Sequence, residues 1–394
     1  MKPPSTRAKL PRNVWVLGFV SMLMDLSSEI YHSLLPVFIT VTLGLPAAAL
    51  GAVDGVAEAT ANFAKLASGR LSDRTGRRKP LVAAGYGLAA LSKPLFPMAG
   101  SLVAVLGARF ADRIGKGIRG APRDAIIADE TPPEIRGRAF GLRQALDTVG
   151  ALLAPLAAIG LMLLFADDIR AVFWVAVIPA ALSFLLVLIA LKEPEQRLAA
   201  SSQKMVAAFR DLDRNMRRLI AVGFLFALAR FSEGFLILKG VEAGLSQTYA
   251  PLTLVLFNLV FLAFAYPAGA LSDRVAPRTL LMAGLAVLIA GDLVLAGVPG
   301  LAGLALGVAL WGAHMALSQG VMARMIADAA PPQLRATGFG AFYFVTGIAT
   351  LLASLAAGLI WDRDGSAAAF VAGAAVAAVT LVMLTLLPDR KAVA

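Results

Sequence analysis

One apolar stretch of the sequence, residues 102–128, carries a series of ionisable side chains. They are Arg109, Asp112, Arg113, Lys116, Arg119, Arg123 and Asp124. Steps of three, four and seven residues place most of them on one face of a helix. Charged groups inside a bilayer are costly, so they face water or a protein partner and often serve ion or proton movement. The pattern predicts a charged stripe that faces a cavity or other helices of the same chain.

Other apolar stretches hold ionisable residues at similar depth. A helix rises about 1.5 Å per residue, and this count places Arg113 near the middle of its stretch, level with Asp25 and Lys93 of other stretches. Opposite charges at matching depth predict ion pairs. The candidate proton-coupling and cavity residues are Asp25, Glu29, Glu58, Arg109, Asp112, Arg113, Lys116, Asp147, Arg230 and Glu233. Acidic and basic residues nearly balance within the apolar stretches of the first half, which argues against a binding site for anions that is formed by positive charges alone. We expect proton coupling to lie in that half.

Asp25 and Glu29 are the candidate proton carriers. A carboxylate that alternates between apolar surroundings and a nearby arginine would load and unload a proton as those surroundings change. The alternative is that Asp25 forms a permanent ion pair with Arg113. The sequence leaves both interpretations open.

The composition excludes several classes of protein. The chain has 394 residues, of which 59% are hydrophobic and only 15% charged, too little polar material to cover a soluble globule. The absence of cysteine excludes disulfides, thiol nucleophiles and Fe–S clusters. With two histidines we expect no metal site and no cofactor. No H-E-x-x-H, G-x-S-x-G or G-x-x-x-x-G-K-[ST] motif occurs, so we expect no enzyme.

The apolar runs predict an all-α polytopic membrane protein with twelve transmembrane helices, because a spanning helix needs about 20 apolar residues. The expected spans are 13–42, 47–69, 80–100, 102–128, 135–165, 169–191, 218–244, 249–271, 278–297, 300–327, 333–361 and 366–387. They predict an N-terminal six-helix bundle at 1–191, a cytoplasmic middle loop at 192–217 and a C-terminal six-helix bundle at 218–394. The first apolar stretch has no small-residue cleavage site, so we interpret it as a retained span rather than a signal peptide.

The net charge of +11 is distributed in a way that indicates topology. Lysine and arginine crowd both termini, the middle loop and alternate short connections, and cytoplasmic loops carry such an excess. We therefore expect both termini in the cytoplasm and no nucleic-acid partner. The expected location is a bacterial inner membrane.

The two halves of the sequence repeat. At an offset of 199, residues 127–129 (Ile-Ala-Asp) match 326–328, and at an offset of 200, residues 71–74 (Leu-Ser-Asp-Arg) match 271–274. Each half has an even number of expected spans, so the halves enter the membrane in the same sense. The repeat predicts two pseudo-symmetric bundles.

The residues between the second and third spans resemble the signature of the major facilitator superfamily (MFS), G-x-L-x-D-R-x-G-R-[KR]. The gating motif comprises Gly69, Asp73, Arg74, Gly76, Arg77 and Arg78, with Asp273 and Arg274 in its degenerate second copy. In that family the carboxylate is held near the start of the eleventh span, and a helix start carries partial positive charge. The resemblance implies the MFS fold. It also implies a cytoplasmic latch, which is a contact of Asp73 that holds the cytoplasmic side of the transporter closed.

A second resemblance concerns the direction of transport. Gly141, Gly150 and Pro155 are similar to the antiporter motif of the fifth span, although Ala154 and Ala158 stand where that motif has glycine. Small residues permit close helix packing in membranes. The relaxed motif favours export, while ordinary helix packing is the other interpretation.

These features predict a secondary transporter that works by alternating access, with proton-coupled export (antiport) of a small organic solute or drug. The alternative is an organic-anion (carboxylate or phosphate) transporter with Arg109, Arg113, Lys116 and Arg230 as ligands. A sensor or scaffold that does not transport is a third hypothesis, for which the charges within the bilayer would be dispensable. The expected partners are a small-molecule substrate, protons and the lipid bilayer, and we expect a monomer driven by the proton gradient.

Overall fold

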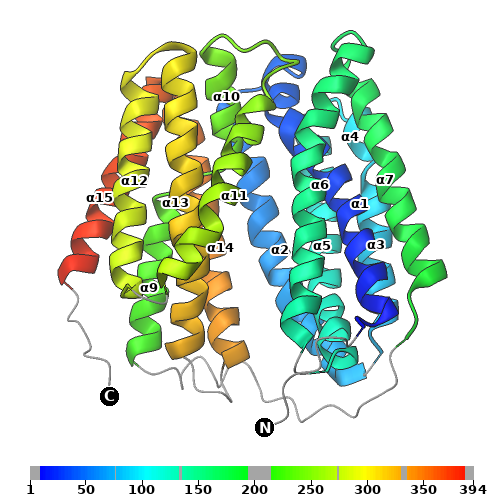
Figure 1. The fold of residues 1–394 in the computed structure, drawn as a ribbon. Helices are drawn as coiled ribbons and strands as arrows, with labels where there is room; N and C mark the ends of the chain where they lie inside the picture. Colours follow the sequence, from blue (N-terminus) through cyan, green and yellow to red (C-terminus); the bar gives the residue numbers. More distant parts are fainter. Residues whose placement is uncertain are drawn as a thin grey trace. The chain divides into compact units, whose positions relative to one another are not determined.

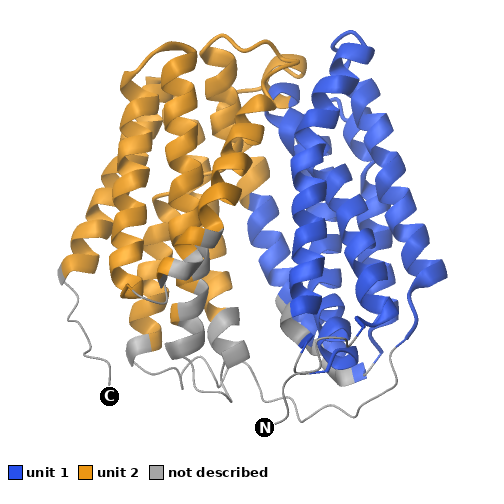
Figure 2. Cartoon of the chain, in the orientation of Figure 1, with its two compact units in different colours: residues 1–38, 56–203 blue, residues 39–55, 204–394 orange. Residues whose placement is uncertain are grey.

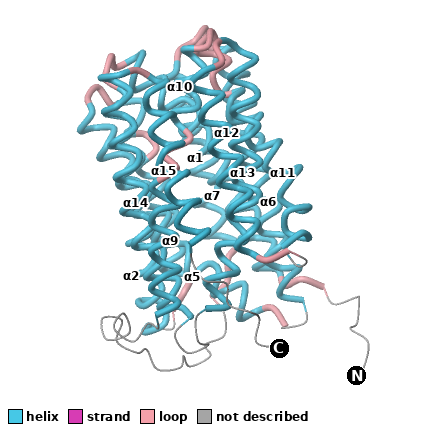
Figure 3. The backbone as a smooth tube through the Cα atoms, turned by 90° about the vertical axis from the view of Figure 1, so that its left-hand side faces the viewer, coloured by secondary structure: helices cyan, strands magenta, loops and turns pink. Residues whose placement is uncertain are grey.

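The computed structural model describes residues 9–75, 77–132, 135–193, 214–272, 275–329 and 335–386. Within these ranges all regular secondary structure is helical, and no strand occurs (Figure 3). Helices suit this sequence because each backbone N–H and C=O group must find a partner within its own segment when no water is present.

The described chain divides into two compact units, residues 1–38 with 56–203, and residues 39–55 with 204–394 (Figure 2). Unit 1 holds α1 (Arg12–Val37), most of α2 (Ala47–Thr75), α3 (Lys79–Ser92), α4 (Leu95–Met98), α5 (Leu102–Glu130), α6 (Arg136–Leu164) and α7 (Ile169–Ala190). The bundle boundaries expected from the sequence stay a prediction.

Unit 2 holds the π-helix η1 (Phe38–Thr42), apart from its first residue, and the first nine residues of α2. It also holds α9 (Arg214–Leu228), α10 (Gly234–Glu242), α11 (Leu252–Ser272), α12 (Pro277–Gly297), α13 (Gly300–Ala329), α14 (Arg335–Asp364) and α15 (Ser366–Leu386) (Figure 1).

Every one of the expected apolar spans contains a helix or two consecutive helices, so the all-α prediction is confirmed for the described residues. Seven helices are long and apolar enough to cross a membrane by length and composition. The count of twelve spans stays a prediction.

Two expected spans are interrupted. The span at 80–100 divides into α3 and α4 at Lys93–Pro94, where proline cannot donate the backbone hydrogen bond that would continue the ladder. The span at 218–244 divides into α9 and α10, and the intervening residues 229–233, here called the helix break, are not helical. The Ser232 hydroxyl accepts a hydrogen bond from the Gly234 backbone N–H at 3.1 Å, as serine does at turns.

Helix starts in unit 1 follow ordinary capping chemistry. The Ser101 hydroxyl accepts a hydrogen bond from the Ala104 N–H at the start of α5. The Asp168 carboxylate accepts two, from the Arg170 and Ala171 N–H groups, at the start of α7. Such caps satisfy backbone donors that have no partner inside the helix.

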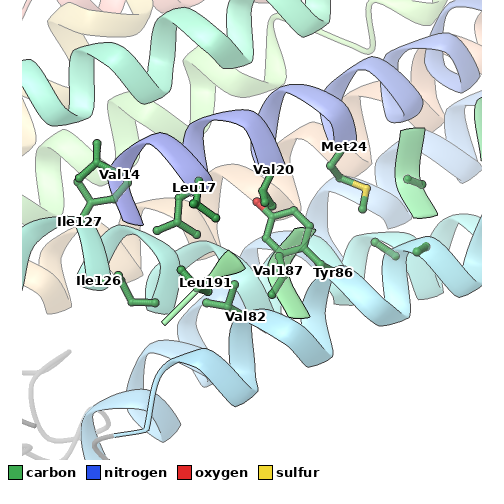
Figure 4. Packing of buried hydrophobic residues seen from close by; sticks show 14 of the residues in the cluster. Val14, Leu17, Val20, Met24, Val82, Tyr86, Ile126, Ile127, Val187 and Leu191 are labelled. Carbon is green, nitrogen blue, oxygen red and sulfur yellow. The ribbon is translucent and has the colours of Figure 1, made fainter. Parts of the chain in front are cut away.

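The core of unit 1 forms around α1 (Figure 4). Val14, Leu17 and Met24 are fully buried on this helix at spacings that share one face. They pack with Tyr86 of α3 and Val187 of α7. In a membrane such contacts stabilise the bundle through van der Waals packing rather than through the hydrophobic effect.

Glycines bring α5 close to its neighbours. A Cβ atom at Gly115 would lie 2.7 Å from the carbonyl oxygen of Gly85 on α3. One at Gly117 would lie 2.8 Å from the carbonyl oxygen of Ala61 on α2. Because any larger residue would separate these backbones, the glycines set the distance at which the charged stripe of α5 meets α2 and α3.

Candidate functional site

A buried ion-pair network connects α5 with α3 and α1. The Lys93 Nζ atom lies 2.9 Å from Asp112 Oδ1 and donates to the Ser28 hydroxyl at 3.0 Å. The other oxygen of Asp112 lies 3.2 Å from Arg113 Nε. The Lys93 ammonium also lies 5.0 Å from the ring centre of Tyr31. Lys93 and Asp112 are almost inaccessible, so this network is a fixed feature of the interior.

Three further arginines of the α5 stripe also face protein. Arg109 reaches His32 Nδ1 of α1 at 3.2 Å. Arg119 lies over the Tyr86 ring of α3, 4.6 Å from its centre, and Arg123 donates to the Ser21 hydroxyl of α1 at 3.0 Å. Most of the stripe therefore faces α1 and α3 rather than lipid.

Lys116 differs from the rest of the stripe because its side chain is exposed. At 3.6 residues per turn it points about 120–140° away from Phe110 and Val103, which are the exposed apolar side chains of the same helix. The side of α5 that carries Phe110 and Val103 suits contact with lipid. The Lys116 direction requires water or polar partners.

Lys116 interacts electrostatically with Arg113 of its own helix and with three carboxylates of unit 1. Electrostatic interactions link it to Asp25 and Glu29 of α1 and to Glu58 of α2. Asp25 and Glu29 are half-buried and Glu58 is exposed. In the part of the chain that the structure describes, none of these four side chains forms an ion pair within 4.0 Å or a hydrogen bond. We call these four residues the Lys116 cluster.

Asp147 has a local partner. Its carboxylate accepts a hydrogen bond from Arg143, one turn earlier on α6, and Arg143 also lies 4.0 Å from Asp124 of α5. Asp147 interacts electrostatically with Asp25 as well, so it lies beside the Lys116 cluster while being neutralised by its own arginine.

The second half places Arg230 and Glu233 at the helix break. The Arg230 guanidinium contacts the sulfur of Met315 on α13, and Glu233 precedes the first residue of α10. Between them, the Ser232 hydroxyl donates to Asp54 Oδ2 at 2.5 Å. A discontinuous helix in a membrane bundle is tolerated where it lines a cavity or is enclosed by protein.

Sequence reasoning did not select Asp292 as a candidate. This residue of α12 is fully buried, and its Oδ1 atom accepts a hydrogen bond from Trp311 Nε1 of α13 at 2.8 Å. The available signal was a single acid inside an otherwise apolar span, which is a functional candidate in its own right.

The gating motif is described only in part. Arg78 forms an ion pair with Asp129 of α5, and its backbone N–H donates to Glu193 Oε1 at 2.7 Å. Arg77 is exposed, and Gly69 packs toward Ala121 of α5, 3.4 Å from a Cβ placed on it. Asp73 and Arg74 belong to the last turns of α2, but their side chains lie outside the description, as do Gly76, Asp273 and Arg274. The latch stays a prediction.

The antiporter-like residues lie on α6. A Cβ atom at Gly150 would lie 2.5 Å from the carbonyl oxygen of Met22, so this glycine permits close contact with α1. Nothing lies within 4 Å of a Cβ at Gly141. Pro155 is inside the helix, and its neighbour Ala154 is fully buried. The small-residue packing therefore centres on Gly150.

The family model of the Major Facilitator Superfamily matches residues 17–246 and 219–394. The chain belongs to the major facilitator superfamily. Members of this family are membrane transporters rather than enzymes, and the chain is a multi-pass membrane transporter. No group of three or more His, Cys, Asp or Glu side chains that could hold a metal occurs among the described residues of this MFS protein.

Similar proteins agree with this assignment. An uncharacterized MFS-type transporter of Methanocaldococcus jannaschii is 33% identical over 361 residues, which cover 90% of this chain and 89% of the relative. The solved nucleoside transporter NupG matches with a TM-score of 0.78 at 15% identity, over 97% of this chain and all of that one. A D-xylose-proton symporter matches with a TM-score of 0.72 at 18% identity, over 95% and 97% of the two chains. At these identities the solved structures support the fold alone.

Proposed function

We propose that this MFS transporter exports a small organic solute in exchange for protons by alternating access. The Lys116 cluster is the observation that carries the proposal. Three carboxylates and one ammonium group interact at a distance, and none is fixed by an ion pair in the described chain. The Lys93–Asp112 pair shows what a fixed pair in the same unit looks like.

The cluster suits proton coupling because its charges are carried by three helices. A nearby cation favours the ionised form of a carboxylate, and removal of that cation or of water favours the protonated form. A movement of α1 or α2 relative to α5 changes the distances of Asp25, Glu29 and Glu58 from Lys116. Each such movement would therefore change the number of protons that the cluster holds.

The direction of transport and the location in the membrane rest on sequence features. The close contact of Gly150 with α1 supports the resemblance to the antiporter motif. The charge distribution supports cytoplasmic termini and, in our proposal, a bacterial inner membrane. We propose that the chain acts as a monomer.

The organic-anion alternative receives less support from the geometry. It requires Arg109, Arg113, Lys116 and Arg230 as ligands. Arg109 and Arg113 are buried, and Arg113 already lies beside Asp112. Arg230 is half-buried and contacts Met315, and Lys116, the exposed member of the four, interacts with three carboxylates.

A flux measurement tests the proposal. A thermal-shift screen of organic solutes at two pH values first identifies a binder, whose flux is then measured in proteoliposomes. One pH unit corresponds to about 1.4 kcal/mol, so a one-unit gradient should drive up to about tenfold accumulation for a one-proton exchange. Accumulation that is indifferent to the imposed gradient would exclude proton coupling.

Single substitutions locate the coupling. Glu29→Gln should keep binding of the same solute but flatten the pH dependence of its transport, because the titrating group is lost. Asp364→Asn, on an exposed acid at the end of α14, is the matched control and should keep the parental profile. A Glu29→Gln profile equal to the parental one would remove this residue from the coupling role.

A further inference from the structure

Asp292 is a carboxyl group in the interior of unit 2 with one of its two oxygens unaccounted for. Its exposed fraction is 0%. Oδ1 accepts the indole N–H of Trp311 at 2.8 Å, whereas Oδ2 is buried with no hydrogen-bond partner among the described residues. An ionised carboxylate has acceptor capacity for about four hydrogen bonds, and here the described protein supplies one.

The uncovered oxygen points toward the helix break. A Cβ atom built on Gly373 of α15 would lie 3.0 Å from Asp292 Oδ2, 3.1 Å from the Phe231 ring and 3.6 Å from the carbonyl oxygen of Ala229. Ala229 and Phe231 belong to the break. The glycine thus leaves space beside which the carboxyl oxygen, an aromatic ring and a backbone carbonyl converge.

No cation compensates Asp292 in the described part of unit 2. From α13 it faces Trp311, from α15 Gly373, and from the break Phe231 and the Ala229 carbonyl. The described titratable groups on these elements are Arg230, which contacts Met315, Glu233 at the end of the break, and His314, which pairs with the Gly284 carbonyl at 2.8 Å. None of the groups that these contacts bring to the Asp292 carboxyl group carries a charge.

A protonated carboxyl group fits this environment better than a carboxylate. An isolated ion in an apolar interior is costly, and such groups take up a proton instead. In the protonated form Oδ1 is the carbonyl acceptor for Trp311, and Oδ2 carries a hydroxyl directed toward the break, where carbonyl groups at the end of α9 lack the partners that a continuous helix would provide.

We propose that Asp292 is a second proton-binding site of this transporter, which holds a proton in this conformation and exchanges it when residues 229–233 move. The site lies in unit 2, apart from the Lys116 cluster of unit 1. Its contribution to transport rests on the proposed proton coupling, whereas its proton occupancy does not.

Infrared difference spectroscopy of the purified transporter in lipid tests the occupancy. At neutral pH the C=O stretching band of one protonated carboxyl group should be present in the parent and absent in Asp292→Asn. Asp362→Asn is the matched control, because that carboxylate accepts two backbone N–H groups and should contribute no such band. An unchanged band in Asp292→Asn would overturn the proposal.

A second variant keeps the test decisive if Asp292→Asn fails to fold. Trp311→Phe removes the only donor to Oδ1 in the described residues, so the C=O band should remain and move to higher frequency. A loss or shift of a carboxylate band instead would show that Asp292 is ionised, and absence of any change would show that the band belongs to another group. Both results would overturn the proposal.

Hydrogen–deuterium exchange of the same band tests the route. The proton must leave through a local opening, so Phe231→Ala, which uncovers the space beside Gly373, should speed exchange by about tenfold, equivalent to about 1.4 kcal/mol of opening free energy. Phe38→Ala, a fully buried aromatic residue at the start of η1, is the control and should leave the rate unchanged. Equal rates in Phe231→Ala and the parent would overturn the break as the route.

Discussion

Lys93 and Lys116 are both cations within apolar stretches of unit 1, and a count of residues along the sequence places them at comparable depth. Lys93 is fully buried against Asp112, Ser28 and the Tyr31 ring. Lys116 is exposed, with three carboxylates at longer range. Depth follows from sequence spacing, but the direction of each side chain depends on which helices pack against it.

The two lysines should respond differently to substitution. Lys93→Met leaves Asp112 buried with fewer partners, and loss of one member of a buried ion pair destabilises by about 3–5 kcal/mol. Lys116→Met breaks no ion pair and should leave the free energy of unfolding within about 1 kcal/mol of the parent while changing the pH profile of transport. Unfolding titrations in mixed micelles measure both, and equal destabilisation would contradict the distinction.

The sequence identified the charged residues better than their partners. The sequence leaves open whether Asp25 pairs with Arg113. In the structure Arg113 lies beside Asp112 of its own helix, and the role of Asp25 stays a prediction. Asp112 and Arg113 are adjacent in the sequence, and residue spacing alone does not reveal that their buried side chains meet. Asp292 was missed because its significance comes from what surrounds it, a tryptophan N–H and no charge.

At the scale of elements, the start of α2 is held by α14. The Asp362 carboxylate accepts the backbone N–H groups of Ala47 at 2.7 Å and Ala48 at 2.8 Å. This cap satisfies two donors that α2 cannot satisfy itself and places negative charge at the positive end of the helix. A Cβ atom on Gly358 would lie 2.6 Å from the Ala48 Cα, so the helices are also in backbone contact.

Removal of this cap should weaken the attachment of α2. Asp362→Ala should lower the free energy of unfolding by roughly 0.5–2 kcal/mol, as loss of a helix cap does. Asp364→Ala, two residues later, removes a carboxylate that is exposed beside Arg363 and should change stability by less than about 0.5 kcal/mol. Thermal unfolding of the two variants should therefore differ, and a pair of equal melting temperatures would contradict the cap.

Glycine positions should also differ in whether they tolerate substitution by alanine. A Cβ atom at Gly51 of α2 would collide with the Ser354 carbonyl group, whereas nothing lies within 4 Å of one at Gly141. Gly51→Ala should destabilise by about 1–3 kcal/mol through overpacking. Gly141→Ala should be neutral or stabilise by up to about 1 kcal/mol, because alanine favours helix. Unfolding free energies decide the comparison, and a tolerated Gly51→Ala would argue against the close contact.

The elements themselves were largely predictable because apolar runs of spanning length are easy to recognise. The interruption at 229–233 was not, since the run continues through it on both sides. Its causes are local and tertiary: Ser232 binds the Gly234 N–H and Asp54, and the Ser232 N–H donates to the Ser354 hydroxyl at 3.1 Å. Asp54 and Ser354 are far away in the sequence.

At the scale of the whole molecule, contacts gather several basic segments of unit 1 at one end. Asn13 at the start of α1 donates to Glu130 at the end of α5 and to the Lys192 carbonyl after α7. The N–H groups of Arg78 and Lys79, at the start of α3, donate to Glu193. By the positive-inside rule, we predict that this end of unit 1 faces the cytoplasm.

The natural absence of cysteine makes the topology directly testable. Arg77→Cys introduces a single thiol at the basic end of unit 1, and Arg363→Cys introduces one in an expected outer connection. A membrane-impermeant maleimide added to intact cells should label Arg363→Cys only, and permeabilisation should add Arg77→Cys. The reverse pattern would invert the predicted orientation.

The internal repeat predicts two bundles at 1–191 and 218–394, and these bounds stay a prediction. The assignment of residues 39–55 to unit 2 was not expected. It depends on the Asp362 cap and on glycine contacts with α14, which have no counterpart in the hydropathy pattern.

Helix α2 therefore belongs to both units. Gly55 is its last residue in unit 2, and Val56 is its first residue in unit 1. No proline interrupts α2, so the helix has no proline kink at which it would bend. If the units rotate relative to each other during a transport cycle, either α2 bends near Gly55 or its first nine residues separate from α14. In the first case the bending stiffness of α2 near Gly55 would oppose the movement.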